Sequence, residues 1–292
     1  MNTIAVVLAL LAAFSYALSS IFAKRGFERA NFLSAAITVT ITVNIALWIL
    51  VFLLVPLHSI SIQGMLLFFL AGALAPGLIR VVWFACIDRI GASVTSSIWA
   101  VSPLFTYIFA ILMLDEDPTL GILTGTILIV FGVVMIEMHG RKIGLKGMKK
   151  GWLILPLLGA MIGGVAVVVR KMGLNIYDEP IIGAAMGNLA ALCLQSILIT
   201  MVSFSFRSSV QFNQQTLRLF WKTAASMCAG WLLTFYALRY GDVTVVRPLT
   251  MMDALFIFPL AHLYLKGLES LSLRLIIGAL IIIAGATAIT FF

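Results

Sequence analysis

Long, almost unbroken runs of apolar residues divide the chain, and each run ends at charged residues, Pro or Gly. A helix rises about 1.5 Å per residue, so roughly 20 apolar residues span a bilayer. Barrel strands would instead alternate apolar and polar residues. The pattern predicts an all-α, polytopic membrane protein with ten transmembrane helices. They lie at Thr3–Phe22, Ser34–Val55, Gly64–Ile87, Ala92–Leu114, Leu120–Ile136, Trp152–Val169, Ile181–Phe204, Leu219–Leu238, Val243–Leu265 and Leu275–Phe291.

The composition excludes a soluble protein and argues against an enzyme. Of the 292 residues, 62% are hydrophobic and 10% are charged, against about half and about a quarter in soluble domains. The three His, three Cys and eleven acidic residues form no catalytic or metal-binding pattern, so we expect no metal and no cofactor. The net charge of +8 lies in loops, which indicates contact with lipid headgroups and not with nucleic acid.

An internal repeat relates the two halves of the chain. The paired positions are Glu116 with Glu269, Gly125 with Gly278 and Gly132 with Gly285, each 153 residues apart, and Arg89 with Arg239 and Gly91 with Gly241, each 150 apart. Glycines also recur for close helix packing, but the matching acidic residue favours a true repeat. Because five is odd, two five-helix halves in series cross the membrane in opposite senses, as in many secondary transporters. We therefore predict a first inverted repeat at 1–137, a basic linker at 138–151 and a second repeat at 152–292, around a central cavity.

Several segments resemble the ten-helix, EamA-type members of the drug/metabolite transporter superfamily. They are "SYALSSIFAKRG", "DRIGASVTSSIWAVSPLFTYIFAILMLDEDPTLG", "ALRYGDVTVVRPLTMMDALFIFPLAHLYLKGLES", "GTILIVFG" and "GALIIIAG". The resemblance covers essentially the whole chain. It implies that the third, fourth, eighth and ninth helices line a central cavity, with alternating access and substrates such as amino acids, other metabolites, nucleotide sugars or drugs. The chain departs from the family pattern at Phe256, where a proline is expected, and in the loop after the second helix, which lacks Lys and Arg.

The predicted third and ninth helices contain three charged residues, Arg80, Arg247 and Asp253. A charge at the bilayer centre costs about 3 kcal/mol or more, so it is treated as functional and is expected to face a cavity or a partner. Arg80 lies about 12 Å from the near end of the third helix, and Asp253 lies near the middle of the ninth. Arg247 precedes Pro248, which suits the first turn of a helix, so we expect Arg247 at a helix mouth. The alternative is that Arg80 and Asp253 form a buried ion pair that fixes helix packing.

Each of the four expected cavity helices carries a stripe of polar or aromatic residues. Helical residues three, four or seven apart share a face. The stripes are Arg80 and Trp83 on the third helix, Trp99, Ser102 and Thr106 on the fourth, and Arg247, Thr250 and Asp253 on the ninth, and Trp231 and Tyr236 are the candidates on the eighth. These ten residues form the predicted substrate-binding site. For the aromatic residues, packing in the core is an equal alternative.

The remaining charges lie near the ends of helices. Lys24, Arg25, Arg170 and Lys171 close the first helix of each half and are predicted to anchor in lipid headgroups. The run Asp115-Glu116-Asp117 and Glu269 could gate the cavity. A solvated cluster near the positive N-terminus of the next helix is the favoured interpretation.

The leading functional prediction is a secondary transporter that moves a small polar, anionic metabolite by alternating access. Two arginines against one aspartate make the lining positive, and Arg binds carboxylate or phosphate in a bidentate fork. The first alternative is an exporter of cationic or apolar compounds that uses Asp253. The second is a membrane scaffold or lipid-handling protein without transport. No ATP-binding motif occurs. The sequence does not decide whether transport is coupled to protons or to another solute, or what the oligomeric state is.

The basic residues predict an orientation. In the ten-helix topology, fourteen of the nineteen lie on the side of the linker, and three (Arg170, Lys171 and Arg239) lie on the side of the termini. Short loops rich in Lys and Arg stay in the cytoplasm. We therefore predict a multi-pass protein of a cell membrane, of the prokaryotic inner or plasma membrane type, with its termini outside. The EamA resemblance implies the reverse orientation.

Overall fold

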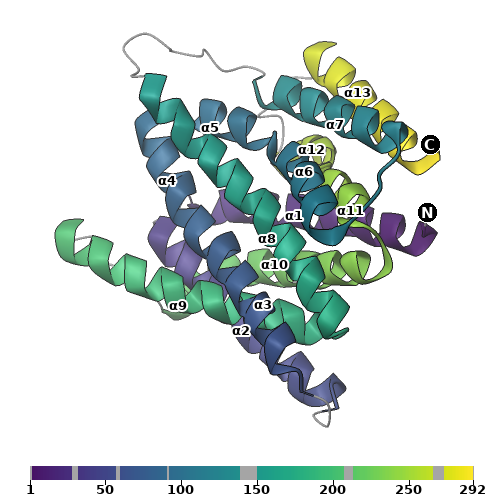
Figure 1. Cartoon of the computed structure of the whole chain (residues 1–292). Coiled ribbons are helices and arrows are strands. Elements are labelled where there is room, and N and C mark those ends of the chain that lie inside the picture. The colour runs from purple at the N-terminus through teal and green to yellow at the C-terminus, as the bar shows by residue number, and fades with distance from the viewer. Residues whose placement is uncertain are drawn as a thin grey trace.

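The computed structural model describes residues 2–27, 32–56, 60–90, 92–138, 150–206, 213–265 and 273–291, and these residues form helices and no strand (Figure 1). The first half contains α1 (Thr3–Phe27), α2 (Phe32–Leu54), α3 (Ile62–Gly72), the π-helical segment η1 (Ala73–Leu78), α4 (Ile79–Ile90), α5 (Ala92–Trp99), α6 (Ser102–Leu114) and α7 (Leu120–Glu137). The second contains the 3₁₀ segment η2 (Lys150–Leu153), α8 (Ile154–Ile176), α9 (Pro180–Phe206), α10 (Gln214–Tyr240), α11 (Val243–Thr250), α12 (Asp253–Leu265) and α13 (Leu273–Phe291).

Helical structure occurs at each of the ten ranges that the apolar runs predict, which confirms the all-α class. Within the described residues, six helices are long and apolar enough to cross a membrane. These are Thr3–Lys24, Ser34–Leu54, Val94–Leu114, Leu120–Glu137, Ile154–Ile176 and Pro180–Leu198. Ile62–Leu78 and Leu275–Phe291 are shorter apolar helices. That ten helices cross the membrane as two inverted repeats stays a prediction, and most of the predicted linker, 139–149, lies outside the described residues.

The repeat glycines of α7 and α13 meet in a reciprocal pattern. A Cβ added to Gly125 would lie 2.5 Å from the carbonyl oxygen of Gly285, and one added to Gly285 would lie 2.6 Å from that of Gly125. Gly132 faces Gly278 in the same way, at 2.8 Å from its carbonyl. The two helices therefore run antiparallel through small residues that let the backbones approach. Gly125 thus contacts Gly285, the repeat counterpart of Gly132, and Gly132 contacts Gly278, the repeat counterpart of Gly125. A local two-fold axis between the helices would relate these two contacts.

The first helix of each half packs mainly on the other half. α1 packs on α10, α11 and α12, whereas α8 packs on α3, α4, α5 and α6. Figure 1 shows α1 lying along α10 and the pair α7 and α13 together at one corner of the bundle. The two halves are thus interlocked, and the helices that contain the predicted site residues lie between them.

Three of the predicted helices are interrupted inside the bundle. Ala75 leaves the helical conformation, with φ −142° and ψ 118°, within η1. α5 and α6 are separated by a turn at Ala100 and Val101, and α11 and α12 by a turn at Met251 and Met252. In lipid, irregular backbone is tolerated where it is buried in protein or lines a cavity. The interruptions therefore mark the interior of the bundle as the place to look for a polar site.

Candidate functional site

A group of polar side chains surrounds these interruptions, and we call it the central polar cluster. It comprises Tyr16 of α1, Ser102 of α6, Arg170 of α8, Trp231 and Thr234 of α10, Arg247 of α11 and Asp253 of α12. Ser102 and Asp253 are the first residues of the half-helices that follow two of the turns. The N-terminus of a helix carries partial positive charge, so both half-helices add to the charge of the two arginines.

Arg170 lies in the interior of the helical bundle, so the prediction that it anchors in lipid headgroups is wrong. Its side chain is 6% exposed, and its Nη2 donates a hydrogen bond to the Ala75 carbonyl at 2.6 Å. Its guanidinium carbon lies 4.4 Å from the centroid of the Trp231 ring, a cation–π contact. The predicted span ended at Val169, but α8 continues to Ile176, which places Arg170 well inside the helix.

Lys171 also binds protein in place of lipid. Its Nζ donates to the carbonyls of Leu238, at 2.6 Å, and Gly241, at 3.0 Å. These carbonyls end α10, where the helix dipole favours a cation. Lys171 therefore fixes the end of α10, and its assignment as a headgroup anchor needs the same correction.

Arg247 joins the two halves at the centre of the cluster. Its Nη2 donates to Ser102 Oγ at 3.3 Å, and it interacts electrostatically with Tyr16, Arg170 and Asp253. Its Nε is buried and has no hydrogen-bond partner within the described residues. The prediction that Arg247 lies at a helix mouth is wrong. α11 begins at Val243 and the turn comes only after Thr250, so Arg247 lies within a short half-helix.

Tyr16 and Asp253 both interact electrostatically with Arg247. The Tyr16 hydroxyl is 3.1 Å from Thr234 Oγ1, which links α1 to α10. Asp253 accepts a hydrogen bond from the backbone N–H of Ala254 at 3.0 Å, at the first turn of α12. Counting these formal charges, the cluster carries two guanidinium groups and one carboxylate.

The other predicted site residues have mainly structural contacts. Trp83 and Trp99 meet edge to face, with centroids 5.0 Å apart. Thr106 and Thr250 each donate to a carbonyl of their own helix. Tyr236 packs against the hydrophobic core. The structure thus joins Ser102, Trp231, Arg247 and Asp253 in or beside one cluster, and a role for the other residues in binding stays a prediction.

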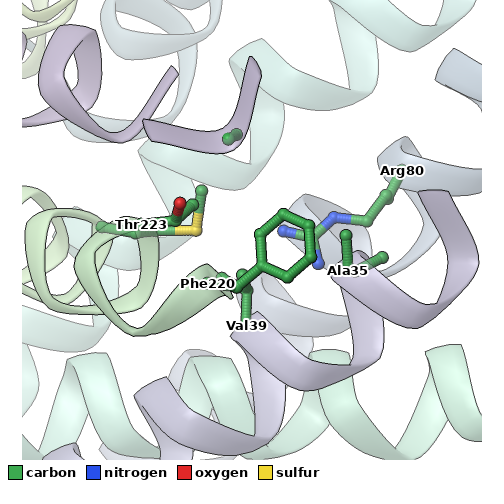
Figure 2. A pocket seen from close by; sticks show the side chains of 8 residues that line it. Ala35, Val39, Arg80, Phe220 and Thr223 are labelled. Carbon is green, nitrogen blue, oxygen red and sulfur yellow. The ribbon is translucent and has the colours of Figure 1, made fainter. Parts of the chain in front are cut away.

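Arg80 contacts α2 and α9 and none of the members of the central polar cluster by a described hydrogen bond. Its Nη1 donates to Thr40 Oγ1 at 2.7 Å and to Gln195 Oε1 at 3.1 Å. It also lines a cavity of about 140 Å³ between α1, α2, α4 and α10 (Figure 2). The lining residues are Ala23, Ala35, Ala36, Val39, Arg80, Phe220, Thr223 and Met227. Asp253 is absent from this described lining and from the described partners of Arg80.

Glu116 connects the halves at the end of the bundle where α6 ends and α11 begins. Its carboxylate accepts hydrogen bonds from the backbone N–H of Val243 at 2.7 Å and of Thr244 at 3.0 Å, and from the Thr244 hydroxyl at 2.7 Å. The favoured interpretation, an acidic group at a helix N-terminus, describes this arrangement, although the helix is α11 and not the next one, α7. The repeat partner Glu269 lies outside the described residues.

Sequence reasoning missed Arg170, Tyr16 and Gln195. A signal for Arg170 was present, because Gly163, Ala166 and Gly173 place it on a face of small residues that is buried in α8. Tyr16 and Gln195 lie in predicted helices that were not expected to line the site. Their contacts join helices far apart in the chain, which helical periodicity cannot reveal.

The fold defines a multi-pass helical membrane protein with a cationic polar cluster between two interlocked halves. Residues 3–138 match the model of the EamA-like transporter family, of the drug/metabolite transporter superfamily, and form an EamA domain. The EamA domain indicates a membrane transporter of the drug/metabolite type. No curated protein matches the chain. One solved crystal structure aligns over 99% of this chain and 97% of its own, with a TM-score of 0.77 at 17% identity, which shows a shared fold.

Proposed function

We propose that the protein is a secondary transporter of a small anionic metabolite and that Arg170 and Arg247 hold the anion in the central polar cluster. The buried, unpartnered Nε of Arg247 is the observation that carries the proposal. A buried donor without a partner costs about 1–3 kcal/mol. A carboxylate or phosphate group would satisfy it and would balance the charge excess of the cluster.

The elements around the cluster suit alternating access. Half-helices whose ends meet at mid-membrane recur in transporters, where the N-terminal ends face anionic groups. α6 and α12 begin at the cluster. The Glu116 contact with α11 joins the halves on one side of it, so its making and breaking would open and close that side.

Direct ligand screening tests the proposal. The purified protein in detergent is heated with mono- and dicarboxylates, sugar phosphates, and organic cations, because a ligand of the native state raises the unfolding temperature. We expect stabilisation by anions. Each hit is then followed as uptake into proteoliposomes, which should fall at least about tenfold in Arg247→Gln, since a charged hydrogen bond contributes about 1.5–3 kcal/mol.

Arg239→Gln is the matched control. Arg239 forms an exposed ion pair with Asp178 at 2.7 Å, on the same helix as Trp231 but outside the cluster, so uptake should be retained. Hits that are all cations, with binding lost in Asp253→Asn and kept in Arg247→Gln, would replace the proposal with the exporter alternative.

A further inference from the structure

Arg80 is a cation without an anionic partner in the described structure. Its two hydrogen bonds, to Thr40 and Gln195, both leave from Nη1 and go to neutral groups. No ion pair joins Arg80 to a carboxylate of the described residues. A buried charge is expensive unless it is paired. The Nε–Nη2 edge of the guanidinium is the edge that suits bidentate contact with a carboxylate.

The cavity beside Arg80 supplies a second unsatisfied polar group. Thr223 is 2% exposed and lines the cavity, and its hydroxyl has no hydrogen-bond partner among the described residues. In Figure 2 the Arg80 side chain extends toward the Phe220 ring, with Ala35 and Val39 beside it. The cavity is therefore lined almost entirely by apolar atoms, and Arg80 and Thr223 are its polar lining residues.

The walls of the cavity favour a ligand with a compact apolar body. A volume of about 140 Å³ is close to that of a buried protein cavity, about 150 Å³, that holds benzene. Phe220, Met227 and Val39 provide apolar contact. Phosphate or a dicarboxylate would lose its hydration here against a single guanidinium, whereas a monocarboxylate with a compact apolar body matches both the charge and the walls.

We propose that this cavity is a binding site for a small apolar monocarboxylate, separate from the central polar cluster. The carboxylate pairs with Arg80 and accepts a hydrogen bond from Thr223, and the apolar body packs on Phe220 and Met227. The inference concerns binding and does not depend on transport. Its lining residues, on α1, α2, α4 and α10, include none of the described partners of Arg170 and Arg247.

Calorimetric titration of the purified full-length protein with benzoate tests the site. Benzoate is compared with benzamide, which lacks the charge, and with acetate, which lacks the apolar body. We expect both to bind at least about tenfold more weakly, since a charged hydrogen bond and the burial of several CH groups each account for such a factor. Equal binding of all three probes, or of none, would overturn the proposal.

Two kinds of variant locate the bound benzoate. Arg80→Gln removes the charge, and Ala36→Met fills the cavity without touching a charge, so the second remains informative if the first fails to fold. We expect either to abolish binding. Ile45→Met adds the same side chain to the exposed face of α2, where Ile45 is 57% exposed, and should leave binding unchanged.

Arg247→Gln separates this inference from the proposed function. Benzoate binding should persist in this variant. Binding that is lost in Arg247→Gln but kept in Ala36→Met would place the anion in the central polar cluster and overturn the separate site. Binding that follows Arg80 and Ala36 while no anion is transported would refute the proposed function alone.

Discussion

Arg170 and Trp231 stack in the interior of the bundle, with the guanidinium carbon 4.4 Å from the ring centroid. The same guanidinium donates to the carbonyl of Ala75, where η1 leaves the helical conformation. One side chain of the second half therefore supports an irregular segment of the first. This double engagement uses the planar donor fork of Arg, which Lys cannot reproduce.

Replacing Arg170 with Met should lower the free energy of unfolding by about 1–3 kcal/mol, because the Ala75 carbonyl loses its buried donor. Arg170→Lys should recover only part of this loss, since an ammonium group cannot stack and bond in the same geometry. Denaturant unfolding in mixed micelles measures both. Arg239→Gln, at an exposed ion pair, should cost at most about 1 kcal/mol. A Met variant as stable as the parent would show that Arg170 has no net structural role.

Glu116→Gln should open the end of the bundle at which α11 begins. The carboxylate makes three hydrogen bonds across the two halves, and the loss of charge weakens charge-assisted bonds whose strength is about 1.5–3 kcal/mol. The reporter is Val246→Cys, at a position 1% exposed, in a protein without Cys86, Cys193 and Cys228. We expect its rate of thiol labelling to rise about tenfold.

The matched control for this experiment is Asp115→Asn. Asp115 is exposed and has φ 54°, a left-handed conformation that Asn tolerates. Its labelling rate should equal that of the parent. If both variants label alike, Glu116 serves only to cap α11 and takes no part in holding the halves together.

Gly125→Ala and Gly285→Ala should destabilise the protein by similar amounts, of about 1–3 kcal/mol, which is typical of overpacking. Each new Cβ would meet the carbonyl oxygen of the other residue, at 2.5 and 2.6 Å. Gly187→Ala should be tolerated, because its nearest neighbour would lie at 3.5 Å. Thermal unfolding of the three variants compares them. Unequal losses at Gly125 and Gly285 would show that their reciprocal contact does not limit both positions alike.

The sequence predicts the helices of this fold well, because a long apolar run indicates a segment that is buried in lipid or protein. It also finds Arg247 and Asp253, because charges stand out in such runs. It does not predict the turns at Ala100 and Met251, which depend on neighbouring helices that cover the freed backbone. Arg80 has two neutral partners, Thr40 and Gln195. They come from helices distant in the chain, and no sequence spacing relates them to Arg80.

The final prediction concerns orientation, and the structure alters the count on which it rests. Arg170 is buried on Trp231 and Ala75, and Lys171 binds the end of α10. Neither contributes a free loop charge, so Arg239 is what remains of the three basic residues assigned to the side of the termini. Of the fourteen on the opposite side, seven lie outside the described residues and seven lie in described helices or helix ends. With fewer free basic residues on the side of the termini, we keep the prediction that the linker side faces the cytoplasm.

A single thiol in the linker tests this orientation. Gly147→Cys, in a protein without the three native cysteines, should resist an impermeant thiol reagent in intact cells and react after the membrane is permeabilised. The same reagent should label Asp178→Cys in intact cells, since the exposed side chain of Asp178 lies at the end of the bundle where α8 ends. The reverse pattern would place the linker outside and would show that the EamA resemblance, and not the distribution of basic residues, gives the orientation of this protein.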